Sequence, residues 1–92
     1  MTLEQLRIFV AVAERGHVTQ AAGALNMTQS AVSAAVAALE ARHGVRLFDR
    51  VGRSIELNVA GRLFLDEARA VLASAAAADH AEGLEADESD VS

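Results

Sequence analysis

The sequence contains no cysteine, no proline, no tryptophan and no tyrosine, and phenylalanine occurs only three times. The lack of cysteine excludes a disulfide framework and a thiolate metal site. The lack of proline removes the strongest helix breaker, so long helices are permitted. With so few aromatic residues, the core must be built from small residues, leucine and valine, which suits closely packed helices better than a β-sandwich. A chain of 92 residues forms one small domain with a modest buried fraction.

Long apolar segments are missing as well. No apolar run approaches the ~20 residues that a membrane-spanning helix needs. The charges of Glu4 and Arg7 are incompatible with a signal peptide at the start of the chain. We therefore expect no membrane association and a cytoplasmic, nucleoid-associated location.

The sequence also lacks the residue spacings of common catalytic and metal sites. His17, His43 and His80 are far apart and show no metal-ligand spacing. Ser30 and Ser33 have no neighbouring histidine or lysine that would activate a hydroxyl group. We expect the chain not to be an enzyme and to have no catalytic residue, no metal ion and no cofactor.

Charge is present but unevenly spread, and the formal net charge is −5. Residues 1–69 hold all eight arginines and seven acidic residues, whereas residues 70–92 hold six acidic residues and no basic one. Within the first part, four arginines fall in a single short stretch: Arg42, Arg46, Arg50 and Arg53. An acidic average argues against a nucleic-acid-binding protein, but this local cluster weakens that argument.

The first half of the chain reads as three helices. Thr2 and Gln5 match a capping box that opens a helix over residues 3–15, and Gly16 can end it. A short alanine-rich helix follows over residues 18–25. Thr28 can cap a third helix that runs to about His43, with Gly44 as its stop; the inward stripe of this helix is Val32, Ala35, Val36 and Leu39. The short turn over residues 25–27 between the last two helices predicts a helix-turn-helix.

The second half begins with a predicted β-hairpin, formed by residues 46–50 and 54–57 with Gly52-Arg53 between them. Asn58 can cap a final helix that is ~30 Å long if it runs to residue 78. Its apolar stripe consists of Phe64, Leu65, Ala68, Val71, Leu72 and Ala75. Such a stripe can lie on its own domain or pair with a partner helix, and we favour dimerisation because a small domain leaves the stripe partly uncovered.

One face of the third helix has the side chains that read base edges. Gln29 can pair with adenine, Ser33 can serve several base edges, and Ala34 suits a thymine methyl group. Thr28 and Ser30 lie at the helix start, where hydroxyl and amide groups can hold a phosphate.

The hairpin adds positive charge beside that helix. Arg50 and Arg53 flank its tip, and an arginine there can enter a narrow minor groove while its neighbour holds phosphate. The plainer interpretation is two solvated loop arginines, but the position directly after a helix-turn-helix favours a wing that contacts DNA.

The predicted organisation has three parts. Residues 1–57 form a winged helix-turn-helix DNA-binding domain, and residues 58–81 form a linker and dimerisation helix. Residues 82–92 form an acidic tail with little to bury, for which we expect disorder.

From Leu3 to about Ala75 the chain resembles the N-terminal winged helix-turn-helix domain of LysR-type bacterial transcriptional regulators. The matching segments are LEQLRIFVAVAERG, AAGALNMTQSAVSAAVAALE and GVRLFDRVGRSIELNVAG. The resemblance implies a mostly α fold with a three-helix core, a β-hairpin wing and a long C-terminal dimerisation helix. It also implies sequence-specific binding of double-stranded DNA by a homodimer joined through residues 58–78, with the recognition helix 28–43 in the major groove and the wing 50–54 at the minor groove.

By position, the resemblance implies that Gln29, Ser33 and Ala34 face bases, that Arg50 meets the DNA backbone and that Arg53 meets the minor groove. The chain departs from the family at Ala34, where a longer polar side chain is common, so the target is expected to be richer in A·T pairs or bound less tightly. His17 stands where a small hydroxyl residue commonly caps the second helix, and we expect a weaker cap. The family's effector-binding domain is absent from the sequence, which is either a fragment of a longer regulator or a naturally short member of the family, and we favour the fragment.

A second hypothesis is a short helical dimerisation module that pairs with a full-length regulator and inhibits it. The acidic residues after residue 70 favour this hypothesis, whereas the arginines between residues 42 and 53 favour DNA binding. At physiological salt, charges are screened over ~8 Å, so an acidic segment at the end of a ~30 Å helix has little effect on a distant DNA-binding surface. We therefore favour DNA binding.

Overall fold

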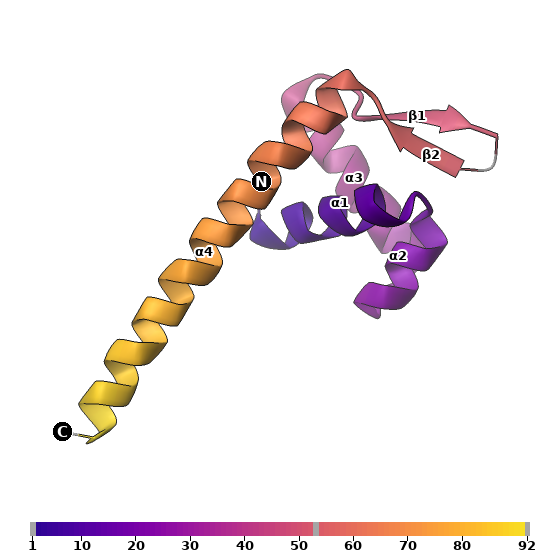
Figure 1. The fold of residues 1–92 in the computed structure, drawn as a ribbon. Helices are drawn as coiled ribbons and strands as arrows, with labels where there is room; N and C mark the ends of the chain where they lie inside the picture. The colour runs from indigo at the N-terminus through magenta and orange to yellow at the C-terminus, as the bar shows by residue number, and fades with distance from the viewer. Residues whose placement is uncertain (1, 53, 92) are drawn as a thin grey trace.

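The computed structural model describes the backbone of residues 2–52 and 54–91 and the side chains of residues 2–52 and 54–77. In order, its elements are α1 (Leu3–Arg15), α2 (Val18–Leu25), α3 (Gln29–His43), β1 (Phe48–Val51), β2 (Ser54–Leu57) and α4 (Val59–Val91). Figure 1 shows α1, α2 and α3 packed together, the hairpin β1–β2 projecting to one side, and α4 running past them as the longest element. The predicted fold, a winged helix-turn-helix followed by a long C-terminal helix, is confirmed.

The ends of α1 follow from local sequence. The Thr2 hydroxyl oxygen accepts a hydrogen bond from the Gln5 amide at 3.1 Å, and the Gln5 side-chain oxygen accepts one from the Thr2 amide at 3.3 Å. This is the predicted capping box, which satisfies backbone donors that a helix start leaves free. Gly16 ends the helix with a φ of 71°, a left-handed conformation that glycine adopts without strain.

The turn between α2 and α3 sets the helix-turn-helix geometry. Asn26 ends α2 with a φ of 57°, the left-handed conformation predicted for it. Two residues later the Thr28 hydroxyl oxygen accepts a hydrogen bond from the Ala31 amide at 3.1 Å and so caps α3. One left-handed residue and one cap therefore redirect the chain between the two helices.

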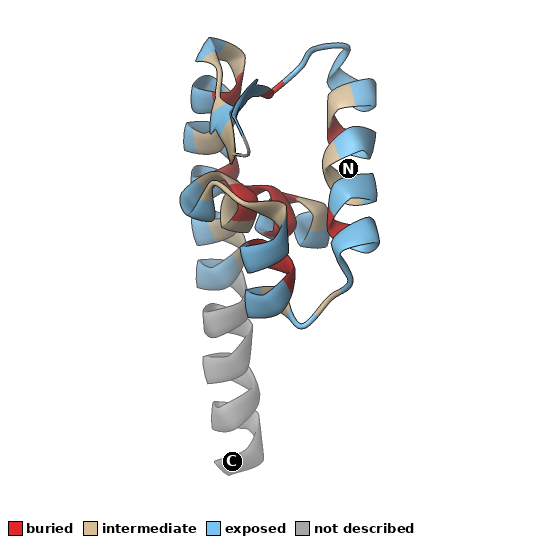
Figure 2. Ribbon diagram, turned by 90° about the vertical axis from the view of Figure 1, so that its right-hand side faces the viewer, coloured by how far each residue is buried: buried red, intermediate tan, exposed pale blue. Residues whose placement is uncertain are grey.

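The three phenylalanines form the centre of the core. Phe9 of α1 is fully buried, and its ring centroid lies 5.4 Å from that of Phe48 in β1 and 5.0 Å from that of Phe64 in α4. Aromatic pairs at these separations add to the stability that burial provides. Figure 2 shows the buried positions on the sides of the helices that face one another. The aromatic contacts thus fasten both the hairpin and α4 to the helical core.

The hairpin is antiparallel, with Phe48 opposite Leu57 and Arg50 opposite Ile55. Its first strand begins at Phe48, so the predicted start near Arg46 was wrong by two positions. The later start is caused by tertiary contacts, because the two residues before Phe48 form hydrogen bonds with other elements.

Residues 46 and 47 bond to neighbouring helices rather than to the other strand. The Asn58 side-chain amide donates to the Arg46 carbonyl oxygen at 2.7 Å. The Leu47 amide donates to the Glu40 carboxylate at 2.8 Å, and the Leu47 carbonyl oxygen accepts from the Asn58 backbone amide at 3.1 Å. This segment therefore connects α3 to the start of α4 before the strand begins.

The start of α4 combines a predicted cap with a close contact that was not predicted. The Asn58 side-chain oxygen accepts a hydrogen bond from the Gly61 amide at 2.8 Å, as expected for an N-cap. Gly61 itself is buried, and a Cβ atom added to it would overlap the carbonyl oxygen of Leu47. Only glycine lets α4 approach the segment before β1 this closely.

The helix α4 extends to Val91, beyond the predicted boundary near residue 81. Its sequence is rich in alanine and contains no proline, so intrinsic helix propensity does not end it earlier. The side chains of residues 78–92 lie outside the described residues, and the acidic tail over residues 82–92 stays a prediction.

The predicted dimerisation stripe of α4 faces largely toward its own domain. Ala68 is only 1% exposed, and Phe64, Leu65 and Leu72 are partly buried against the core. Ala75 is half-buried, whereas Val71 is 44% exposed. The domain itself therefore covers part of the stripe, and the role of these residues in dimerisation stays a prediction.

The outward side of α4 carries other apolar residues. Val59 is 76% exposed and Leu63 is 65% exposed, one helical turn further along. An exposed ion pair joins the inward side to α1, with the Arg69 guanidinium 3.2 Å from the Glu14 carboxylate.

Among the described residues, none of the helices has both the length and the apolar character that a membrane-spanning segment requires.

Candidate nucleic-acid interface

The helix α3 divides into a buried side and an exposed side, as its sequence pattern predicts. Val32 and Leu39 are fully buried in the core. Gln29 and Ser33 are exposed on the opposite side, and so are Ser30, Ala34, Ala37, Ala38 and Ala41. Because every exposed side chain from Ser30 to Ala41 is a serine or an alanine, the backbone of α3 can approach a surface closely.

The start of α3 offers hydrogen-bonding groups in addition to these side chains. The Thr28 oxygen is used as the capping acceptor for the Ala31 amide, which leaves its hydroxyl hydrogen free to donate. Ser30 is exposed in the first turn, where backbone amides of a helix favour negative charge. This end of α3 is suited to an anionic partner.

A depression of about 480 Å³ lies between α2, α3 and the hairpin. We call it the interface groove and define it by Gln29 and Ser33 of α3 and Arg50 of β1, which line it together. These three residues were predicted from sequence as DNA contacts, and the fold brings them to one surface. None of the described residues that line the groove is acidic, so Arg50 gives it a positive charge.

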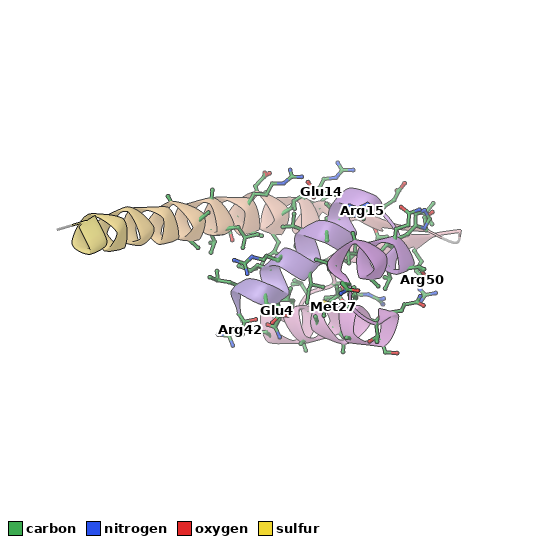
Figure 3. All side chains as sticks on the ribbon, turned by 90° about the horizontal axis from the view of Figure 1, so that it is seen from below. Glu4, Glu14, Arg15, Met27, Arg42 and Arg50 are labelled. Carbon is green, nitrogen blue, oxygen red and sulfur yellow. The ribbon has the colours of Figure 1, made fainter. Side chains whose placement is uncertain are left out.

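The arginines that cluster in the sequence are only partly brought together by the fold. Figure 3 shows Arg50 near the end of α3 that begins at Gln29 and Arg42 near the opposite end. Arg46 and Arg50 both line a smaller depression of about 160 Å³ between α3 and β1, together with Ser33, Glu40 and Asp49. Arg53 lies outside the described residues. Arg50 is therefore the described arginine that lines the interface groove, whereas Arg46 lies in the adjoining depression.

Four residues at the start of α2 also line the interface groove, and sequence reasoning did not assign them to the site: His17, Val18, Thr19 and Gln20. Thr19 and Gln20 are exposed and are the polar residues of an otherwise apolar helix, VTQAAGAL. These two polar residues in an apolar helix were the sequence feature that could have indicated a surface contact. Their proximity to the hairpin depends on tertiary packing and could not be read from the sequence.

The predicted weak cap at His17 is confirmed, because its side chain makes no capping hydrogen bond to α2. Within the described part of the chain, no three histidine, aspartate or glutamate residues are grouped as metal ligands. The groove offers one guanidinium group, the imidazole of His17 and hydrogen-bonding side chains from four residues: Thr19, Gln20, Gln29 and Ser33.

Comparison with known proteins identifies the family of the chain. Residues 3–62 match the family model described as bacterial regulatory helix-turn-helix protein, lysR family. The chain is 48% identical over 81 residues to the HTH-type transcriptional regulator ShiR of Corynebacterium glutamicum, a match that covers 88% of the chain and 28% of that protein. The chain therefore spans little more than a quarter of the length of this curated relative.

Two crystal structures of DNA complexes are similar in fold. One is the complex of the CbnR DNA-binding domain with DNA, with a TM-score of 0.87, 40% identity, and 94% of this chain and 99% of that chain covered. The other is the complex of the BenM DNA-binding domain with catB site 1 DNA, with a TM-score of 0.89, 30% identity, and 94% and 97% of the two chains covered. With its family model matched from the start of α1 into α4, the chain belongs to the lysR family of bacterial regulatory helix-turn-helix proteins.

Proposed function

We propose that the chain binds double-stranded DNA sequence-specifically, as the DNA-binding part of a LysR-type transcriptional regulator. The observation that carries the proposal is the interface groove, in which Gln29 and Ser33 of α3 meet Arg50 of β1 without an acidic side chain among the lining residues. Its support from comparison is the similar fold of two DNA-binding domains whose crystal structures contain DNA.

In this proposal, α3 enters the major groove with its first turns facing the bases. A major groove about 12 Å wide admits one α-helix, and the small side chains of α3 allow a close approach. Gln29 pairs with adenine, Ser33 donates to or accepts from a base edge, and Ala34 contacts a thymine methyl group. Thr28 and Ser30 hold a phosphate at the start of the helix.

The hairpin supplies the second set of contacts. Arg50 is exposed on β1 and neutralises a backbone phosphate, which adds affinity without sequence preference. We also propose that Arg53 meets the minor groove, where an arginine is attracted by the enhanced negative potential of narrow A·T-rich segments.

The net charge of −5 does not oppose this proposal. All six acidic residues beyond residue 70 lie at or after Asp79. At 1.5 Å per residue, Asp79 is roughly 30 Å along α4 from its start. Charges at that distance are screened from the interface groove, because the Debye length at physiological salt is ~8 Å.

The proposed complex is a homodimer joined through α4, since two half-sites read by two copies of α3 extend the recognised sequence. Ala68 is already buried by its own domain, so a partner helix has access to other residues. Val71, from the predicted set, is exposed, as are Val59 and Leu63 on the outward side. Exposed apolar residues on a long helix favour a partner helix as their cover.

The proposed role needs no catalytic step, and the protein acts on DNA in the bacterial cytoplasm. The curated relative ShiR is named a transcriptional regulator, which agrees with a function in binding rather than catalysis.

Selection from a random pool of duplexes tests the proposal. The chain should enrich a consensus made of two related half-sites, with centres about one helical turn or a multiple of it apart. Each half-site should contain adenine or thymine where Gln29 and Ala34 face the bases. Failure to enrich any sequence, with no retention of duplex DNA even at low salt, would contradict the proposal.

A further inference from the structure

His17 occupies the position before α2 where helices usually carry a capping side chain. Its backbone has the extended conformation of an N-cap residue, with φ −143° and ψ 129°, but its imidazole makes no capping hydrogen bond. Serine, threonine, aspartate and asparagine are preferred at such positions because their oxygen atoms reach the free amides of the helix. The imidazole of His17 therefore does not cap α2, although it lies at the capping position.

His17 lies between two depressions of different charge. On one side it lines the interface groove with Gln29, Ser33 and Arg50, where no described lining residue is acidic. On the other side it lines an open depression of about 470 Å³ between the end of α1, β2 and the start of α4. The side chain is half-buried and is accessible to a ligand in the interface groove.

The charged groups around His17 come from four elements. The neighbouring residues of α2 and α3 in the interface groove are uncharged, and β1 contributes Arg50. The end of α1, β2 and α4 contribute two acids and two bases to the other depression: Glu14, Arg15, Glu56 and Arg62. In the described part of the chain, the ion pair at 3.2 Å joins Glu14 to Arg69, and no carboxylate is paired with His17. A positive charge on His17 would thus be available to an external anion.

We infer that protonated His17 binds a phosphate of the DNA backbone, so that the chain binds duplex DNA more tightly as the pH falls. The inference rests on the proposed function, because it places the phosphate in the same groove that α3 and β1 offer to DNA. Histidine is the side chain that changes charge in the range from about pH 5 to about pH 8. An imidazolium donates a charge-assisted hydrogen bond to a phosphate oxygen and adds one cation to the set that displaces counterions from DNA.

The test uses a fluorescently labelled duplex of arbitrary sequence, about 30 base pairs long, because a phosphate contact does not depend on the bases read. Fluorescence anisotropy at constant low ionic strength gives the dissociation constant at about pH 7.5 and about pH 5.5, on either side of the usual histidine titration. We expect the wild-type chain to bind roughly three- to tenfold more tightly at the lower pH. His17→Gln should bind almost equally at both values.

His43→Gln is the matched control, since it removes the same kind of group from a different place. His43 is the last residue of α3, and the centroid of its ring lies 4.9 Å from that of Phe64 in α4. It does not line the interface groove. It should retain the wild-type pH dependence. His17→Ser is a second test variant, because serine can cap α2 and so keeps the fold while removing the titrating group.

The salt dependence gives a readout that a purely structural role would not change. At the lower pH, the slope of log K against log salt should be smaller in His17→Gln by about 0.9 for each phosphate that the variant no longer neutralises. Unchanged pH dependence and unchanged salt slope in both His17 variants would overturn the inference while leaving the proposed function intact. A wild-type chain that binds no duplex at either pH would instead contradict the proposed function itself.

Discussion

Gln29 at the start of α3 and Arg50 in β1 line one depression, although they belong to different elements that the buried core holds together. The first side chain can form paired hydrogen bonds with a base, and the second carries a fixed positive charge. Their common surface joins base recognition to phosphate binding. This relationship leads to expectations that differ for the two residues.

Replacing Arg50 should weaken binding to all duplexes alike. Arg50→Ala removes a cation that faces the interface groove, so the slope of log K against log salt should fall by about 0.9. Sequence preference, measured as the affinity ratio of the selected and a scrambled duplex, should stay the same. Arg42→Ala is the matched control, because Figure 3 places Arg42 near the other end of α3. An equal loss in both variants would contradict the assignment of Arg50.

The contact between Gly61 and Leu47 should be sensitive to a single methyl group. Gly61→Ala places a Cβ atom onto the Leu47 carbonyl oxygen and close to the Leu57 side chain, so α4 must shift away. We expect a destabilisation of about 1–3 kcal/mol, measured as the free energy of unfolding in urea.

Gly23→Ala is the control for that substitution. Gly23 lies in α2, is exposed, and has open space where its Cβ atom would be. Alanine is the better helix former, so this variant should be about 0.5–1 kcal/mol more stable than wild type. If Gly61→Ala were also stabilising, the close approach of α4 to Leu47 would be wrong.

A capping side chain at the start of α2 should increase the stability of the protein. His17→Ser supplies an oxygen that can accept from an amide of the first helical turn, and we expect about 0.5–2 kcal/mol of added stability by thermal or urea unfolding. Thr28→Ala tests the opposite change, since it removes the existing bond to the Ala31 amide and should cost about 1 kcal/mol. A His17→Ser variant less stable than wild type would mean that the imidazole supports α2 in another way.

Substitutions on the two sides of α4 should have separable effects. Leu63→Asp changes a residue that is 65% exposed and should lower the dimer fraction in sedimentation without lowering the unfolding temperature of the domain. Leu72→Asp changes a side chain packed against the core and should destabilise the domain itself. Dimerisation unaffected by Leu63→Asp would place the proposed interface on another side of α4.

The sequence was sufficient for most of the helical framework because the signals are local. The capping box of Thr2 and Gln5, the left-handed Asn26 and the cap at Thr28 each act within a few residues, and all were predicted. The predicted start of β1 was wrong because residues 46 and 47 are held outside the strand by other elements. The Arg46 carbonyl oxygen accepts a hydrogen bond from Asn58, and the Leu47 amide donates one to Glu40.

The same distinction applies to the candidate site. The polar side of α3 could be predicted from its helical period, and Arg50 from its place near the turn of a hairpin. His17 was recognised only as a poor cap, because its position between two depressions depends on how α1, α2 and the hairpin pack. The apolar stripe of α4 could be seen in the sequence, but the surface that covers Ala68 could not.

The central claim, that α3 reads bases, is tested most directly by measuring Gln29→Ala against the selected duplex and a scrambled one. The account predicts a loss of about 1–3 kcal/mol in binding free energy on the selected duplex and almost none on the scrambled one. Changing the adenine that faces Gln29 should abolish the difference between wild type and variant. Equal discrimination between the two duplexes by wild type and Gln29→Ala would contradict base reading by this face of α3.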